Sequence, residues 1–127
     1  MLSLNSNTRY FLYQSYIDMR KSFNGLCGIV TNELHQDILG NDVFIFFNKR
    51  KTHIKLLAFE GDGFAIYYKR LEKGTYEFAA DSSPDRSSLL SYSQLLLILQ
   101  GISLKKVNYR RRYKKIPELS TAEAVSS

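Results

Sequence analysis

Basic side chains are the residues of this sequence whose types and spacing suggest chemistry. Seven of them lie in an acid-free stretch: Lys105, Lys106, Arg110, Arg111, Arg112, Lys114 and Lys115. Tyr109 and Tyr113 lie among the arginines four positions apart, a spacing that places both on one side of a helix. Arg and Lys neutralise phosphates, and Tyr stacks on unpaired bases. The segment therefore predicts nucleic-acid binding, and the alternative is a solvated extension that aids solubility.

Further basic residues gather around three strand-like runs in the middle of the chain. They are Lys49, Arg50 and Lys51 at a turn, Lys55 in the following run, and Lys69 and Arg70 at the end of the run after that. Neighbouring strands lie about 4.8 Å apart, so these positions could form one continuous anion-binding patch. For the lysine-rich turn, the alternative is protection of a sheet edge against aggregation.

Catalytic and metal-binding groups are sparse. Metal-assisted hydrolysis or phosphoryl transfer needs clustered carboxylates, or His and Cys at coordinating spacing. His35 and His53 lie in different elements, where we expect a helix end and a sheet edge. Glu60 and Asp62 fit a tight turn, and Cys27 fits the apolar face of a helix as a small buried hydrophobic residue. Neither a phosphate-binding nor a dinucleotide-binding glycine motif is present. The sequence predicts no enzyme activity, no metal and no cofactor.

Length and composition favour one globular domain. The chain has 127 residues, 44% of them hydrophobic, with nine Tyr and eight Phe to fill a core. A single cysteine excludes an intramolecular disulfide. We find neither a signal peptide nor a run of about 18 apolar residues that would span a membrane, so we expect a cytoplasmic location. Outside the basic segment, eleven Lys and Arg face twelve Asp and Glu, which makes the body nearly neutral.

The elements that must position these residues follow from hydrophobic periodicity. An amphipathic helix is predicted from Phe23 to Leu34, although Gly25 and Gly28 weaken it. A second helix, capped by Ser91 and buried on the sheet, should end at Gly101. The predicted strands are Arg9–Gln14, Val43–Asn48, His53–Glu60, Phe64–Leu71 and Thr75–Ala79, and Ala80–Ser88 is predicted to be a loop.

These elements predict an α+β fold with one domain. An antiparallel meander of about five strands should pack against two helices, because the gaps between the central strands suit hairpin turns. Val43–Asn48 is apolar on nearly every residue, so both of its faces should be covered. The expected organisation is a disordered N-terminus over residues 1–8, the domain over 9–104 and a basic extension over 105–127.

Four blocks of sequence resemble one protein family. Asp18–Leu26 reads D-M-R-K-S-F-N-G-L, Val43–Arg50 reads V-F-I-F-F-N-K-R, and the other two are I-K-L-L…D-G-F…Y-K-R-L-E-K-G and L-L-L-I-L-Q-G. In order and spacing they are similar to the motifs of the TnpB accessory proteins, the products of the second open reading frame of insertion sequences of the IS 66 type. The resemblance covers roughly residues 9–102. The chain departs from the family in having Asn24 where the signature has Asp, and in having no Trp.

The resemblance implies a non-catalytic accessory protein of transposition, whose larger partner, the transposase, would cleave the DNA strands. The basic positions shared with the family would form its nucleic-acid surface: Arg20, Lys21, Lys49, Arg50, Lys55, Lys69 and Arg70. For Arg20, an ion pair with Asp18 or with an acid at a sheet edge is the alternative.

Two main hypotheses of function follow. The first is a DNA-binding accessory protein that contacts phosphates with little reading of bases. The second is a protein–protein adaptor that docks on the transposase through its aromatic-rich strands without touching DNA. A third, hydrolysis, would need a cleft with two carboxylates or histidines.

Overall fold

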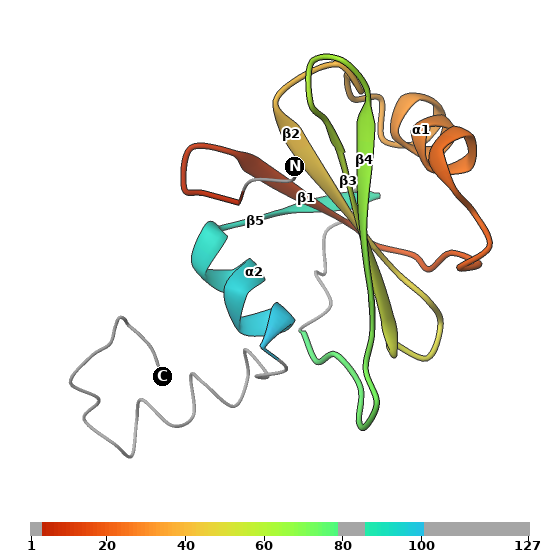
Figure 1. Ribbon diagram of the computed structural model, residues 1–127, viewed down its shortest axis with the longest axis vertical. Helices are drawn as coiled ribbons and strands as arrows, with labels where there is room; N and C mark the ends of the chain where they lie inside the picture. The colour runs from red at the N-terminus through yellow and green to blue at the C-terminus, as the bar shows by residue number, and fades with distance from the viewer. Residues whose placement is uncertain (1–3, 79–85, 101–127) are drawn as a thin grey trace.

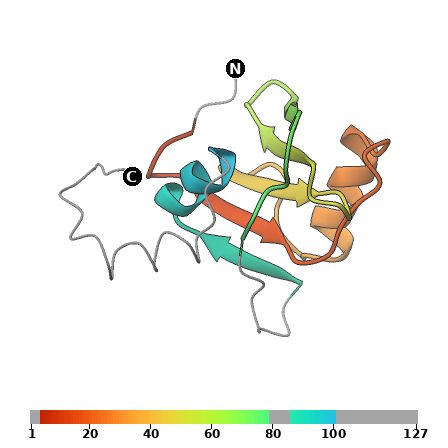
Figure 2. The same cartoon turned by 90° about the horizontal axis from the view of Figure 1, so that it is seen from below.

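The computed structural model describes residues 4–78 and 86–100, which form a five-stranded sheet with one helix on each face (Figures 1 and 2). This confirms the predicted α+β class. In chain order the elements are β1 (Arg9–Tyr13), α1 (Phe23–Asn32), β2 (Asp42–Phe47), β3 (His53–Phe59), β4 (Phe64–Arg70), β5 (Ser87–Leu90) and α2 (Tyr92–Leu99).

The strands lie in the order β4-β3-β2-β1-β5. β2, β3 and β4 form the predicted antiparallel meander. β1 instead runs parallel to β2, because the chain between them crosses one face of the sheet through α1. β5 then pairs antiparallel with the other side of β1. The sheet is therefore a meander extended by one parallel and one antiparallel strand.

β2 contributes to both hydrophobic cores of the protein, one on each face of the sheet. All six of its residues are buried, as the sequence predicts for a strand covered on both faces. Val43, Ile45 and Phe47 pack on the α2 side with Leu95 and Ile98 of that helix. The other core, on the α1 side, contains Phe44 and Phe46 of β2 together with Tyr13, Ile17, Leu26, Ile29, Val30, Leu34 and Leu57.

The segment after β4 differs from the prediction. Thr75–Ala79 was expected to be a strand, but residues 75–78 are not one in the structure. Gly74, at a φ of 74°, turns the chain away from β4, and the backbone N–H of Tyr76 bonds the carbonyl of Lys51 at 2.7 Å. Tyr76 is 1% exposed and packs on the ring of Phe47. The alternating aromatics therefore fill the core on the α2 side instead of forming a strand.

The fifth strand is β5, in a segment whose composition predicted a loop. Ser87 and Ser88 belong to the predicted loop Ala80–Ser88, yet they pair with Tyr13 and Leu12 of β1. The two serines suit an edge strand, since in the part of the chain that the structure describes one side of β5 has no neighbouring strand. Residues 80–85 of that predicted loop lie outside the described part of the chain.

Both helices begin where the sequence places them. Ser91 caps α2 through a reciprocal pair of hydrogen bonds with Gln94. Gly101, the predicted end of α2, lies outside the described residues. α1 ends at Asn32 and is followed by His35 at a φ of 53°, in agreement with a histidine at a helix end.

Residues 4–8 fall in the expected disordered N-terminus, but in the structure they fold back on the sheet. The hydroxyl of Tyr10 donates to the carbonyl of Asn5 at 2.7 Å and accepts from the N–H of Asn5 at 2.7 Å. Leu4 packs against the core on the α2 side. A buried tyrosine with a hydroxyl to satisfy thus anchors the segment before β1.

Two buried tyrosines should respond oppositely to loss of the hydroxyl. Tyr76 Oη is buried and has no hydrogen-bond partner among the described residues, and burial raises its pKa from 10.0 to about 12. We expect Tyr76→Phe to raise the free energy of unfolding by about 1 kcal/mol, and Tyr10→Phe to lower it by about as much. Chemical denaturation of both variants measures this difference.

The stability gained in Tyr76→Phe should also grow as the pH rises from 10.0 towards about 12. Over that range the unfolded state of the parent releases the Tyr76 proton and the folded state keeps it, so the parent loses stability. A stability difference between Tyr76→Phe and the parent that stays constant over this pH range would contradict the prediction. Tyr10→Phe, which keeps Tyr76, is the control and should lose stability with pH as the parent does.

Candidate nucleic-acid interface

Of the eight predicted basic residues that the structure describes, five lie at one end of the sheet: Lys49, Arg50, Lys51, Lys69 and Arg70. β1, β2 and β4 end there, whereas β3 and β5 begin there, as the strand pairing requires. The β2–β3 turn, the last residues of β4 and the residue before β5 are all basic. We call this set the basic rim: Lys49, Arg50, Lys51, Lys69, Arg70 and Arg86.

The β2–β3 turn is fixed by the side chain of Asn48. Its Oδ1 accepts from the backbone N–H groups of Thr52 and His53 at 2.9 and 3.0 Å, and its Nδ2 donates to Thr52 Oγ1 at 2.9 Å. Lys51 takes a φ of 59°, which completes the turn. All three basic residues of the turn are exposed. A rigid backbone therefore presents three cations to solvent.

Lys69 and Arg70 point to opposite faces of β4, because successive strand residues alternate. The ammonium of Lys69 lies 3.5 Å from the carbonyl oxygen of Leu99 in α2. Arg70, on the other face, lies 3.5 Å from the carboxylate of Glu72. The rim thus has cations on both sides of the sheet.

Arg86 is a rim residue that sequence reasoning missed. Its guanidinium lies 3.1 Å from Glu33, whose carboxylate also accepts from the hydroxyl of Tyr13 at 2.8 Å. Desolvation, followed by the bond to Glu33, raises the pKa of Tyr13. Arg86 would have been found if Ser87–Leu90 had been recognised as the partner of β1.

The opposite end of the sheet carries acids. Glu60 and Asp62 lie at the β3–β4 turn, where Gly61 takes a φ of 94°, as expected for a tight turn. Asp42 begins β2 and binds Arg9 through two hydrogen bonds of 2.9 and 3.0 Å. The six basic residues of the rim therefore lie at the end of the sheet opposite Asp42 and the β3–β4 turn, although Glu33 and Glu72 also reach the rim as partners of Arg86 and Arg70.

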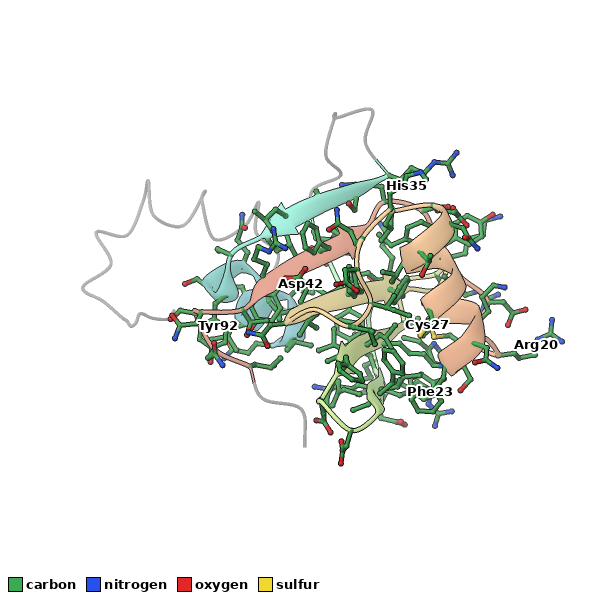
Figure 3. The ribbon with its side chains drawn as sticks, turned by 90° about the horizontal axis from the view of Figure 1, so that it is seen from above. Arg20, Phe23, Cys27, His35, Asp42 and Tyr92 are labelled. Carbon is green, nitrogen blue, oxygen red and sulfur yellow. The ribbon has the colours of Figure 1, made fainter. Side chains whose placement is uncertain are left out.

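Arg20 is bound to Asp18, the alternative considered from the sequence. The carboxylate of Asp18 accepts from the guanidinium of Arg20 at 2.7 to 3.1 Å and from its backbone N–H at 2.9 Å. The hydrogen bonds with Arg20 lower the pKa of Asp18 to about 2. The side chain of Arg20 is nonetheless 91% exposed and projects beside the start of α1 (Figure 3).

Lys55 lies inside the fold. It is 7% exposed, and its ammonium donates to the carbonyl oxygens of Met19 and Lys21 at 2.8 and 2.7 Å. The ring of Tyr68 lies 4.9 Å from the same nitrogen. Burial lowers the pKa of Lys55. Its charge is therefore used to fasten the loop before α1 to β3.

Lys21 is exposed and directly precedes the start of α1. Its side-chain stem lies against Gly25, where an added Cβ would approach Lys21 Cβ to 3.3 Å. Ser22, the N-cap residue, makes no side-chain capping bond. The glycine that weakens the helix prediction thus makes room for the lysine stem.

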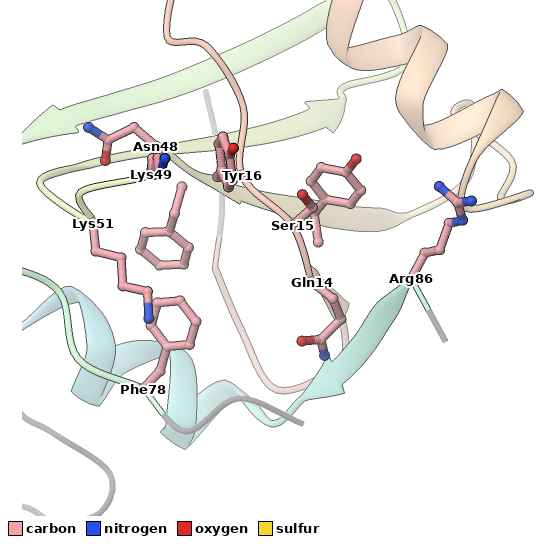
Figure 4. A pocket seen from close by; sticks show the side chains of 10 residues that line it. Gln14, Ser15, Tyr16, Asn48, Lys49, Lys51, Phe78 and Arg86 are labelled. Atoms are coloured by element: carbon pink, nitrogen blue, oxygen red, sulfur yellow. The ribbon is translucent and has the colours of Figure 1, made fainter. Parts of the chain in front are cut away.

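A pocket of about 480 Å³ opens in the middle of the basic rim, at the carboxyl ends of the parallel strands β1 and β2 (Figure 4). Gln14 and Ser15 follow β1, and Asn48, Lys49 and Lys51 follow β2. The full lining is Tyr13, Gln14, Ser15, Tyr16, Phe47, Asn48, Lys49, Lys51, Phe78 and Arg86.

The remaining reactive side chains do not assemble into a reactive centre. No group of three His, Cys, Asp or Glu residues that could hold a metal ion occurs among residues 4–78 and 86–100. Cys27 packs against the α1-side core, as predicted, and burial raises the pKa of its thiol. His53 begins the inner strand β3 instead of lying at a sheet edge, and its Nδ1 lies 2.7 Å from Thr52 Oγ1.

Two further features of the sequence concern the basic segment and membrane-spanning helices. The basic segment lies beyond the described residues: Lys105, Lys106, Arg110, Arg111, Arg112, Lys114 and Lys115. Within the described ranges, neither helix is long and apolar enough to cross a membrane.

Comparison with known proteins places the chain in a family. Residues 8–109 match the family described as IS66 Orf2 like protein. The uncharacterized protein y4jC of Sinorhizobium fredii is 29% identical over 96 residues, covering 71% of this chain and 82% of that protein. The uncharacterized protein y4hO of the same organism is 28% identical over 102 residues, covering 80% and 87%. No solved structure matches significantly.

The family match includes all the helices and strands of the structure and leaves out only residues 4–7 of the described chain. It also contains the four sequence blocks that resemble the TnpB accessory proteins. The chain therefore belongs to the IS66 Orf2-like family of transposition-associated accessory proteins.

Proposed function

We propose that this protein is a non-catalytic transposition accessory factor that binds DNA phosphates through the basic rim, assisted by the basic segment at positions 105–115. The turn at Lys49, Arg50 and Lys51 carries the proposal, because none of the three forms an ion pair within the described residues. Exposed cations without a carboxylate partner keep their attraction for phosphate. Because the DNA of a bacterium lies in its cytoplasm, the proposed role requires a cytoplasmic location.

The extent of the rim supports contact with several phosphates. It crosses five strands, and at about 4.8 Å between neighbours this amounts to roughly 19 Å. Duplex DNA carries one charge per about 1.7 Å of its axis, so a length of that size holds roughly eleven phosphate charges, and those on the near side face the surface. Contacts between cations and phosphates do not read the bases, so we expect binding that depends little on the DNA sequence.

Other predicted residues contribute differently to the proposed surface. Lys21 extends it on the α1 side of the sheet, where its charge is exposed. Asp18 offsets the charge of Arg20, so Arg20 should contribute less than Arg50. Lys55 is left out, because its ammonium already binds two carbonyl groups.

Docking on the transposase is the second candidate function. β4 is an edge strand, and Tyr67 and Tyr68 on it are 41% and 52% exposed. Exposed tyrosines beside unpaired backbone groups suit a protein partner that adds a strand or packs on the edge. This role is compatible with DNA binding at the rim, since the tyrosines precede the basic end of β4.

Substitution of Arg50 by Gln tests the rim. We expect Arg50→Gln to weaken binding to duplexes of any sequence about equally, and to lower the slope of log affinity against log salt by about one. Arg9→Gln is the matched control, because it removes the same charge at the opposite end of the sheet. Titrations at two salt concentrations, below the melting temperature of both variants, make the comparison. Equal losses in both variants would refute a localised rim, and no duplex affinity even at the lower salt would refute DNA binding.

Replacement of Arg110, Arg111 and Arg112 by Ala separates the two candidate functions. If the segment binds phosphates, this variant should bind all duplexes more weakly and with a flatter salt dependence. Co-purification with the transposase that survives both nuclease and the triple substitution would instead favour docking without DNA.

Lys55 and Lys69 should separate folding from DNA binding. Lys55→Met removes a charged donor from two carbonyl groups, so we expect the free energy of unfolding to fall by about 2 kcal/mol. The salt slope of DNA binding should stay unchanged at temperatures where the variant is folded. Lys69→Met should do the reverse, with a stability change within about 0.5 kcal/mol and a lower salt slope. A lower slope in Lys55→Met would show that its ammonium reaches DNA.

A further inference from the structure

The pocket in the basic rim has features that phosphate binding alone does not require. It lies where the parallel strands β1 and β2 end, a position at which α/β sheets commonly bind ligands. Its volume of about 480 Å³ is within the range of about 300–1,000 Å³ found for small-molecule sites. A surface serving only the DNA backbone would need cations but no cavity.

Aromatic rings and cations alternate in the lining. The rings of Phe47 and Phe78 stack with centroids 4.5 Å apart, and Lys51 Nζ lies 4.6 Å from the centre of the Phe78 ring. Across the lining, Lys49 Nζ lies 5.7 Å from the ring of Tyr16, which is 55% exposed. Rings stack on bases and ammonium groups neutralise phosphates, so this combination matches both parts of a nucleotide.

Gln14 adds a hydrogen-bond donor to the lining. Its Nε2 is buried and has no acceptor among the described residues. Asn48, the other amide in the lining, already bonds Thr52 and His53. In Figure 4 the side chain of Gln14 lies across from those of Lys51 and Phe78. A buried donor without a partner is unfavourable, and an acceptor on a ligand, such as a base carbonyl or ring nitrogen, would satisfy it.

We propose that this pocket holds one unpaired nucleotide of a bound DNA strand. Its base would take the place of the Lys51 ammonium over the Phe78 ring, and that ammonium would turn with Lys49 to the phosphate of the nucleotide. The inference rests on the proposed DNA binding of the rim and deepens it. A base within a duplex must lose its pairing and stacking before it enters a pocket, and this cost is smallest for an unpaired base, so the site favours DNA that contains one. The rim then binds the phosphates on either side of that nucleotide.

A duplex with a single bulged nucleotide tests the pocket. Its affinity is compared with that of the same duplex carrying an abasic bulge, so that the charges are equal and only the base differs. We expect the base to strengthen binding roughly 5- to 150-fold, the range that corresponds to stacking on one aromatic ring. With 2-aminopurine as the bulged base, stacking should also quench its fluorescence. The chain has no Trp to interfere with that signal.

Two variants assign the effect to the pocket. Phe78→Leu should abolish the preference for the base while binding to the fully paired duplex persists. Gln14→Leu removes the buried unpartnered donor without disturbing the core, and should reduce the preference about 2- to 10-fold. Arg50→Gln is the control, because it should weaken binding to both bulged duplexes equally.

The possible failures are distinguishable. Equal affinity for the base-containing and abasic bulges, with normal duplex binding, would overturn the pocket inference and leave the proposed function intact. Affinity for none of the DNAs would overturn both. Competition by free deoxyadenosine monophosphate as effective as that of the bulged duplex would assign the pocket to a free nucleotide and also overturn the inference.

Discussion

The buried ammonium of Lys55 is the interaction that holds the loop before α1, and with it the start of that helix, on the sheet. A charge in a low-dielectric site must have partners, and the carbonyl oxygens of Met19 and Lys21 provide them. They can do so only if the loop before α1 lies directly on β3. That constraint fixes the start of α1, and Asp18 and Arg20 complete the loop by binding each other. The D-M-R-K block and the I-K block of the sequence are therefore two halves of one structural unit.

The path of the chain concentrates charge at one end of the sheet. Because β1 and β2 are parallel while the other strand pairs are antiparallel, the β2–β3 turn, the ends of β1 and β4 and the start of β5 meet at the rim. The three groups of basic residues in these connections are far apart in sequence and share one end only because of this topology. The charges of the three groups add at this end of the sheet, and Glu33 and Glu72 offset part of the sum.

The sequence predicted what depends on local pattern and missed what depends on pairing. The strands β1 to β4, both helices and the Ser91 cap follow from periodicity and capping residues. Tyr76 and Phe78 alternate as in a strand, yet their positions are set by the core that they fill. β5 is a short run of two serines and two leucines after a polar segment, so only its pairing with β1 reveals it, and Arg86 with it. The burial of Lys55 likewise depends on a loop more than thirty positions away in sequence.

Asn24, which stands where the family signature has Asp, changes the charge at the start of α1. It is the second residue of α1, where an aspartate would interact favourably with the positive end of the helix dipole and partly cancel it. In this chain the first turn of α1 contains no acid and Ser22 makes no side-chain cap. The positive end of the helix therefore stays uncompensated beside Arg20 and Lys21. The substitution lowers the intrinsic stability of α1 slightly, and under the proposed function it removes a carboxylate that would repel phosphate beside Arg20 and Lys21.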